Sequence, residues 1–274
     1  MTRSSRWLAL IAAAPLLLLP RLLAAQESDA DWVERCLDDR HGARIMHCEV
    51  RDVAVQTTGS LDLESQNGVV DIRGADGTTV RLRARVRAWA DTREEAVARA
   101  RAVRVVVDGG TVRADGPSSS RGEGWNVDFV GSVPRRYDLE LSTENGPLSV
   151  RDVSGRIDVE SQNGPLDLAR VGGTLRARAA NGPVTLELAD ERVAEQGVDV
   201  RTSNGPLTIL VPRSIDGRLQ AGTENGPIST DLDVEIRRHS RHSVSGEIDA
   251  QLGSGGGTIR AHTSNGPLTV RSSR

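Results

Sequence analysis

Apolar and polar side chains alternate along much of this chain. Ile157 and Val159 alternate with Asp158 and Glu160, and a second alternating stretch follows at 166–168. Alternation with a period of two is typical of a β-strand that has one buried face and one face in water. The pattern therefore predicts two short strands, separated by the turn residues Asn-Gly-Pro.

The same unit, a strand, Asn-Gly and a second strand, recurs along the chain. Successive asparagines are 78, 18, 18, 23, 21 and 40 residues apart. We interpret the first gap as an insertion and the last as two units, one of them a degenerate copy at 246–259. A period of about 20 residues indicates a repeat architecture. The predicted repeat corners are Asn67, Asn145, Asn163, Asn181, Asn204, Asn225 and Asn265.

Two architectures fit these units, a meander of β-hairpins and a β-solenoid. Asn-Gly between alternating strands ordinarily favours a hairpin. Proline follows Asn-Gly in six of the seven units, and it lacks the N–H that would close a two-residue turn. We therefore expect an all-β fold, a parallel β-solenoid or β-helix of about 18–23-residue repeats with Asn-Gly-Pro corners, in which stacked units bury one another.

The insertion has a different pattern. Residues 80–88 carry arginine at every second position, which predicts a strand with an arginine face. Thr92 and Glu95 have the spacing of a capping box, so we expect a short helix over about 92–102. A hairpin is expected near 105–114. Together these predict a small α+β insertion that protects a sheet edge.

The first 25 residues have the layout of a secretory signal peptide. Arg3 and Arg6 precede an apolar stretch, and the small residues Ala24 and Ala25 suit cleavage. The alternative is a membrane anchor, but the uncharged apolar run of about 13 residues is shorter than the ~20 that a spanning helix needs. We expect an exported protein, periplasmic, outer-surface or secreted, with no transmembrane anchor after signal cleavage.

Export bears on the two cysteines. In an oxidising compartment, Cys36 and Cys48 are expected to form a disulfide. The alternative is a redox or metal pair that includes His41 and His47, but this spacing matches no common zinc module. A further histidine pair, at the ends of 239–242, is interpreted as part of a basic loop, and the alternative is a metal site.

These patterns divide the chain into four parts. Residues 1–25 are the signal peptide, and 26–57 are an N-terminal disulfide segment. Residues 58–135 hold the first repeat with the α+β insertion, and 136–274 hold the β-solenoid repeats.

Composition narrows the classes of partner. Aromatic residues make up 2% of the 274 residues, and none follows Tyr137. The formal net charge is −3, from 38 acidic and 35 basic residues. Platforms for nucleic-acid bases need aromatic side chains, and an acidic chain gains nothing from phosphate electrostatics. We expect a thin aliphatic core and no nucleic-acid partner.

Several features together resemble a known bacterial family. Val-Pro precedes a strand that ends in Asn-Gly at 133–146 and 211–226, and a glycine run leads into 263–266. Cys-Glu-Val-Arg at 48–51 precedes an arginine-rich strand and an alanine-rich helix. Over 36–274 the chain resembles the β-strand-repeat proteins grouped as putative adhesins, a domain family of unknown function. The resemblance implies an extracytoplasmic β-solenoid-like domain linked to the cell envelope or to envelope stress, and it brings no catalytic residues.

Parallel β-helices often carry carbohydrate-active enzymes, which need paired carboxylates. We interpret the candidate acids as the solvated face of a sheet, because arginines can pair with them. No aromatic side chain that could stack on a sugar follows Tyr137. No catalytic triad, calcium loop or phosphate loop is visible. We therefore expect no catalytic residue, bound metal or cofactor. The candidate acids are Asp138, Glu140, Asp158, Glu160 and Asp167.

The arginine face is the strongest candidate for binding. Residues 78–104 contain eight arginines against three acids, and arginine binds phosphate or carboxylate groups through paired hydrogen bonds. The alternative is a solubilising face of an edge strand. The predicted contacts to an anionic polymer are Arg81, Arg83, Arg85 and Arg87.

We therefore expect a non-enzymatic extracytoplasmic β-repeat protein, an adhesin-like scaffold or binding module at the bacterial cell envelope. Its partner would be an envelope polysaccharide, lipopolysaccharide or an envelope protein. Two alternatives are open, a carbohydrate-active β-helix enzyme and an accessory protein of envelope-stress regulation.

Overall fold

The computed structural model describes residues 28–38, 44–108, 110–120, 122–238 and 245–273. The predicted signal peptide, His41 and the histidine pair of 239–242 lie outside these residues. The described chain forms twenty strands and two helices. None of its helices is both long enough and apolar enough to cross a membrane.

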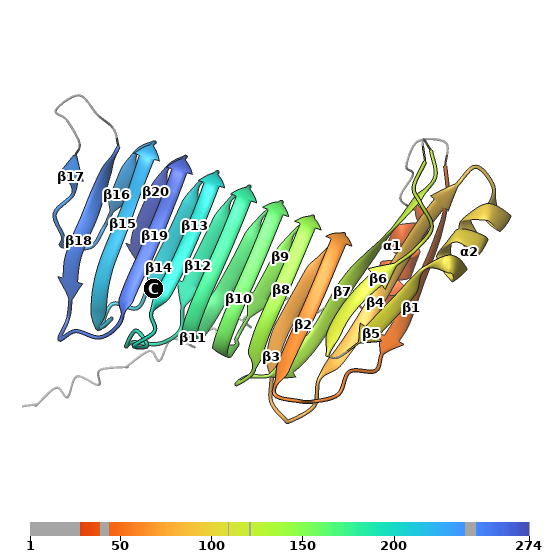
Figure 1. Cartoon of the computed structure of the whole chain (residues 1–274), viewed down its shortest axis with the longest axis horizontal. Coiled ribbons are helices and arrows are strands. Elements are labelled where there is room, and N and C mark those ends of the chain that lie inside the picture. Colours follow the sequence, from red (N-terminus) through yellow and green to blue (C-terminus); the bar gives the residue numbers. More distant parts are fainter. Residues whose placement is uncertain (1–27, 39–43, 109, 121, 239–244, 274) are drawn as a thin grey trace, which may run out of the picture.

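The strands form two layers joined through β11, and Figure 1 shows them side by side along the molecule. In spatial order, layer A consists of β1 (Ile45–Val53), β4 (Arg81–Ala90), β7 (Gly124–Pro134), β3 (Val70–Ala75), β9 (Leu148–Arg151), β11 (Leu166–Asn181), β12 (Val184–Leu188), β14 (Leu207–Val211), β20 (Leu268–Ser272) and β16 (Ile228–Thr230). Layer B consists of β5 (Arg104–Asp108), β6 (Thr111–Asp115), β2 (Ser60–Asn67), β8 (Asp138–Asn145), β10 (Ser154–Asn163), β11, β13 (Val198–Asn204), β19 (Thr258–Asn265), β15 (Gly217–Asn225), β18 (Gly246–Leu252) and β17 (Arg237–Arg238).

The prediction of a parallel β-solenoid is wrong, because the all-β fold is a mixed sheet with two helices. Antiparallel pairs lie at both ends of the layers, β1–β4–β7 and β5–β6 at one end and β15–β18–β17 at the other. The order of strands also departs from the order of the chain, since β19 lies between β13 and β15.

The prediction of strand direction and order failed because alternation shows which face of a strand is buried but not its direction or its neighbours. The degenerate copy at 246–259 shows this most clearly. It lacks Asn-Gly-Pro, and its first strand, β18, runs antiparallel to β15. Antiparallel strands of this kind cover the edges of the parallel strands in the middle of each layer.

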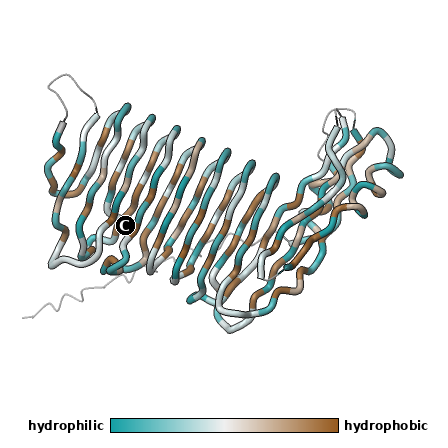
Figure 2. Tube along the Cα trace, in the orientation of Figure 1, coloured by the Kyte–Doolittle hydropathy of each residue, from teal (hydrophilic) through white to brown (hydrophobic). Residues whose placement is uncertain are grey.

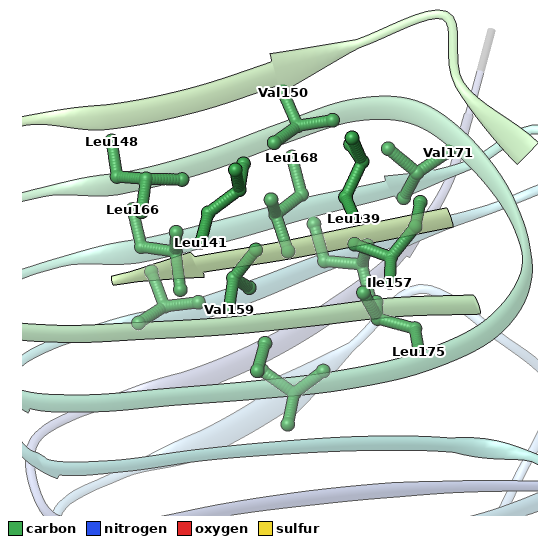
Figure 3. Packing of buried hydrophobic residues seen from close by; sticks show 14 of the residues in the cluster. Leu139, Leu141, Leu148, Val150, Ile157, Val159, Leu166, Leu168, Val171 and Leu175 are labelled. Carbon is green, nitrogen blue, oxygen red and sulfur yellow. The ribbon is translucent and has the colours of Figure 1, made fainter. Parts of the chain in front are cut away.

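The core lies between the two layers and is almost entirely aliphatic. Leu139, Ile157 and Leu175 lie in register on neighbouring strands of layer B, and Leu148 and Leu166 do so in layer A. All five are at most 3% exposed, and Figure 3 shows side chains of both layers packed against one another. Figure 2 shows the matching alternation of hydropathy along the strands. Full burial of each such side chain stabilises the fold by about 1.5–3 kcal/mol.

The asparagines of the repeat units stack where the chain passes from layer B to layer A. Asn145 Nδ2 donates to Asn67 Oδ1 at 3.2 Å, and Asn163 Nδ2 donates to Asn145 Oδ1 at 3.1 Å. The ladder continues through the other four asparagines at 3.0–3.1 Å. The glycine after each asparagine lies so close to the neighbouring backbone that a side chain would not fit. A Cβ on Gly164, at a φ of +148°, would lie 2.2 Å from the Gly146 carbonyl oxygen.

Two helices flank the arginine strand β4. The helix α2 (Arg93–Ala102) begins with the predicted capping box of Thr92 and Glu95, and both hydrogen bonds of that box are present. The helix α1 (Asp29–Asp38) buries Trp32 and Cys36. Cys36 forms a disulfide with Cys48 of β1, the pair that the sequence predicted. The disulfide therefore ties α1 to layer A, next to β4.

Candidate anion-binding site

The four predicted arginines lie on the outward side of β4, because the residues between them point into the core. Leu82, Ala84 and Val86 are at most 3% exposed. The outward side chains line a hollow of about 890 Å³ bounded by α1, β3, β4 and β7, which we call the arginine hollow. Its charged lining is Arg35, Arg73, Arg81, Arg83, Arg85, Arg87, Asp29, Asp71 and Asp128.

One end of the hollow is closed by α1, which places Asp29 and Trp32 over β4. Asp29 pairs with both Arg83 and Arg85, and the Arg85 Nη2 to Asp29 Oδ1 distance is 3.1 Å. The guanidinium carbons of Arg85 and Arg87 lie 5.5 and 5.9 Å from the Trp32 ring centre. Cation–π contacts of this kind contribute about 0.5–2 kcal/mol. These arginines are therefore already engaged within the protein.

Asp128 forms part of the floor of the hollow and is 7% exposed. Burial raises the pKa of Asp128 above its ordinary range, although a hydrogen bond from the Val69 N–H and the charges of Arg87 and Arg85 act against that shift. The Val69 nitrogen lies 2.9 Å from Asp128 Oδ1.

The other end of the hollow presents two arginines that are not engaged in this way. Arg81 of β4 lies in register with Ser132 of β7, and Ser132 lies in register with Arg73 of β3. Because neighbouring strands are about 4.8 Å apart, the two arginine backbones flank the serine at a separation of about 10 Å. Within the described chain, no hydrogen bond or ion pair joins either guanidinium to another residue, although the charge of Arg73 helps to lower the pKa of Asp152. We call Arg73, Arg81 and Ser132 the open end.

The open end has the donor set of an oxyanion site. Two guanidinium groups offer paired N–H donors, and the serine hydroxyl offers a third donor group between them. Phosphate and carboxylate oxygens accept such bonds in a bidentate arrangement. Asp71, the carboxylate of the hollow that shares β3 with Arg73, pairs with Arg151 of β9, whose Nη1 lies 3.2 Å from Asp71 Oδ1. An external anion would therefore meet donors with little internal competition.

The sequence predicted four of the residues that line the hollow and did not predict the others. Alternation places Arg81, Arg83, Arg85 and Arg87 on one face, and the structure does bring them together. Three of the four, Arg83, Arg85 and Arg87, contact α1, and Arg81 lies at the open end. Arg73, Ser132, Asp29 and Trp32 were missed, because they come from β3, β7 and α1. The Asp71-Ile72-Arg73 alternation marked Arg73 as outward-facing, but only strand pairing brings it to β4.

The candidate acids of the enzyme alternative lie elsewhere. Asp138 Oδ1 accepts from the Arg156 N–H at 2.8 Å, and Asp167 Oδ2 lies 3.5 Å from Arg151 Nη2. Asp158 lies beside Arg176, 3.9 Å away. None of the five carboxylates lines the arginine hollow. In the described part of the chain, no group of three or more histidines, cysteines and acids is placed to hold a metal ion.

No family model matches the chain, and no curated protein matches it. Solved structures of bacterial proteins are similar to it at low sequence identity. A putative cell adhesion protein of Clostridium sporogenes has a TM-score of 0.41 and 10% identity, with 83% of this chain and 100% of the other covered. A putative adhesin of Bacteroides fragilis has a TM-score of 0.31 and 10% identity, covering 83% and 97%.

A putative lipid binding protein of Parabacteroides distasonis has a TM-score of 0.29 and 8% identity, also covering 83% and 97%. Similarities this distant assign neither a family nor a function to this chain. The resemblance to the adhesin family therefore stays a prediction.

Proposed function

We propose that this chain is a non-enzymatic binding module of the bacterial cell envelope that holds an acidic polymer in the arginine hollow. The supporting observation is the open end, where Arg73 and Arg81 flank Ser132 and neither makes a hydrogen bond or ion pair within the described chain. The polymer would be lipopolysaccharide or an acidic polysaccharide, because phosphate and carboxylate groups both accept paired hydrogen bonds from arginine.

The shape and charge of the hollow support a polymer segment as the ligand. Its volume of about 890 Å³ is within the range of ordinary ligand sites. Its lining holds six arginines against three aspartates, one of which is buried Asp128. The hollow is therefore a positively charged region that attracts anions, although the whole chain has a formal net charge of −3. Export through the first 25 residues and an adhesin-like role are parts of the same proposal.

The test is a titration of the mature chain with lipopolysaccharide, alginate and neutral dextran. Lipopolysaccharide offers phosphate, alginate offers carboxylate, and dextran offers neither. The proposal expects binding of at least one acidic polymer and none of dextran. Arg73→Gln together with Arg81→Gln is expected to weaken that binding at least about tenfold, since each charge-assisted hydrogen bond is worth ~1.5–3 kcal/mol.

The matched control is Arg213→Gln together with Arg271→Gln. Both arginines are exposed and lie outside the hollow, so the control removes the same total charge. Binding should stay within about twofold of wild type, because distant exposed charges are screened. Equal loss in the two double variants, or equal binding of dextran, would contradict the proposal.

A further inference from the structure

The outward side of layer B carries its charges in two blocks. The strands β2, β8 and β10 present an acidic block, and the next three strands, β11, β13 and β19, present an arginine block. We call the two blocks together the charged face. The acidic block is Asp62, Glu64, Glu140, Asp158 and Glu160, and the arginine block is Arg176, Arg178, Arg201 and Arg260. One outward charge of opposite sign lies within each block, Arg156 on β10 and Asp199 on β13.

Like charges are direct neighbours within each block. Asp62, Glu140 and Asp158 occupy the same register position on three adjacent parallel strands. Arg178 and Arg201 do so on β11 and β13. Neighbouring strands are about 4.8 Å apart, and like charges at that separation destabilise a sheet. A surface of opposite pattern would relieve this repulsion.

Ion pairs within the chain compensate little of it. The two blocks meet at the β10–β11 boundary, where Asp158 and Arg176 are 3.9 Å apart and about half exposed. Arg201 is held by Asp199 of its own strand, with Nε 2.8 Å from Oδ1. Glu160 and Arg178 are in register across the boundary, but no ion pair joins them.

We propose that the charged face binds the charged face of a second copy of this chain. A two-fold axis parallel to the strands, at the β10–β11 boundary, lays each acidic strand over an arginine strand of the other copy. Glu160 then faces Arg178 of the second copy, and Asp62 faces Arg260 of the second copy. Both copies present the same patch to each other, as an isologous interface requires.

The charge pattern also fixes the orientation of the pair. A two-fold axis across the strands would lay β2 over β2 and β10 over β10, and so place acids against acids. With the axis along the strands, Glu140 is the one member of the acidic block that faces an acid, Asp199 of the second copy. That carboxylate is already bound by Arg201. Electrostatic complementarity of this kind sets orientation and specificity more than affinity.

The size of the face fits a reversible contact. Six strands at about 4.8 Å give a width of about 29 Å, and about six residues along each strand give a length of about 20 Å. The area is therefore about 600 Å² per copy, at the low end for specific interfaces. We expect a weak, salt-sensitive dimer.

The test is sedimentation velocity of the mature chain over a range of protein concentration. It is run at about 0.01 M salt, where the screening length is about 30 Å, and at about 1 M, where it is about 3 Å. The proposal expects a dimer at low salt that dissociates at high salt. A wild-type chain that stays monomeric at low salt, or a dimer indifferent to salt, overturns it.

Charge reversal tests which face is used. Glu160→Arg and Arg178→Glu should each weaken the dimer at least about tenfold, because like charges then face each other. An equimolar mixture of the two variants should dimerise again, as should the double variant E160R/R178E, because both restore opposite charges. The control is Arg271→Glu on the outward side of β20, which should leave the dimer unchanged.

Circular dichroism of each variant shows whether the fold is retained. Loss of the dimer in Arg271→Glu as well as in Glu160→Arg, or no recovery in the mixture, overturns the assignment of the face. The proposed polymer site lies on the outward side of layer A, so polymer binding by the E160R variant is expected to be unchanged. Each of the two proposals can therefore fail without the other.

Discussion

Asp29 in the first turn of α1 accepts a hydrogen bond from Arg85 of β4 over 3.1 Å. The Arg85 side chain is 10% exposed, and the same carboxylate also pairs with Arg83. An acidic residue of the protein thus occupies, at one end of the arginine hollow, the kind of position that a polymer carboxylate or phosphate would occupy at the open end.

Asp29→Asn should change stability and binding in opposite directions. Removing the carboxylate leaves nearly buried Arg85 less well compensated, so we expect the free energy of unfolding to fall by about 1–3 kcal/mol. The affinity for an acidic polymer should rise, because Arg83 loses an internal competitor. Urea unfolding and polymer titration measure the two effects.

The control for this change is Asp52→Asn. Asp52 is 95% exposed and lies 3.7 Å from Arg83, so its removal should change stability by less than about 0.5 kcal/mol. A D29N variant that binds the polymer more weakly than wild type would contradict the idea that Asp29 competes with the ligand.

Reduction of the Cys36–Cys48 disulfide should loosen α1. A bridge that closes a loop this short stabilises the fold by about 3 kcal/mol. When it is reduced, Asp29 and Trp32 are held over β4 by fewer constraints, and polymer affinity should increase. Titration with and without dithiothreitol measures this change.

The variant C36S/C48S serves as the control for reduction. It should bind like the reduced wild type and should not respond to dithiothreitol. A response of this variant to the reductant would show that the effect does not arise from the disulfide.

Gly164→Ala should be far more damaging than its size suggests. The new Cβ would lie 2.2 Å from the Gly146 carbonyl oxygen, at a φ of +148°. Gly77 also has a positive φ, +115°, but no heavy atom lies within 4 Å of a Cβ built there. We expect Gly77→Ala to cost about 1 kcal/mol and Gly164→Ala more than about 3 kcal/mol. Chemical unfolding of both variants checks this difference, and equal losses would contradict the close packing of the corners.

Asp128 predicts a specific pH dependence. Its pKa in the folded protein is raised above the ordinary value of 3.8 by burial. Its contribution to stability is therefore present below that ordinary value and is lost as the pH rises through the folded-state pKa. The free energy of unfolding of wild type, minus that of Asp128→Asn, should fall as the pH rises through this window. Urea unfolding at a series of pH values measures the difference, and an increase with pH would contradict the assignment.

Much of the local structure follows from the sequence. Alternation identifies strands such as β10, the spacing of Thr92 and Glu95 identifies α2, and the predicted export together with two cysteines identifies the disulfide. The neighbours of the strands do not follow. Nothing in the alternation of 258–272 places β19 between β13 and β15 rather than beyond β15, because alternation sets the buried face of a strand and not its neighbours.

The arginine hollow was predictable to the same extent. The faces of single strands follow from alternation, so Arg81 and Arg73 could each be assigned an outward position. Their proximity depends on β7, which pairs antiparallel with β4 and parallel with β3. Such an arrangement joins segments about fifty residues apart in the chain, and no local pattern encodes it.

Modification of arginines with phenylglyoxal, in the presence and absence of a saturating acidic polymer, tests the central claim most directly. Mass spectrometry of the digested chain gives the extent of modification at each arginine. The proposed site predicts that the polymer protects Arg73 and Arg81 and leaves Arg213 and Arg271 as reactive as before. Equal protection of all four, or reactivity of Arg73 and Arg81 that is unchanged by bound polymer, would contradict it.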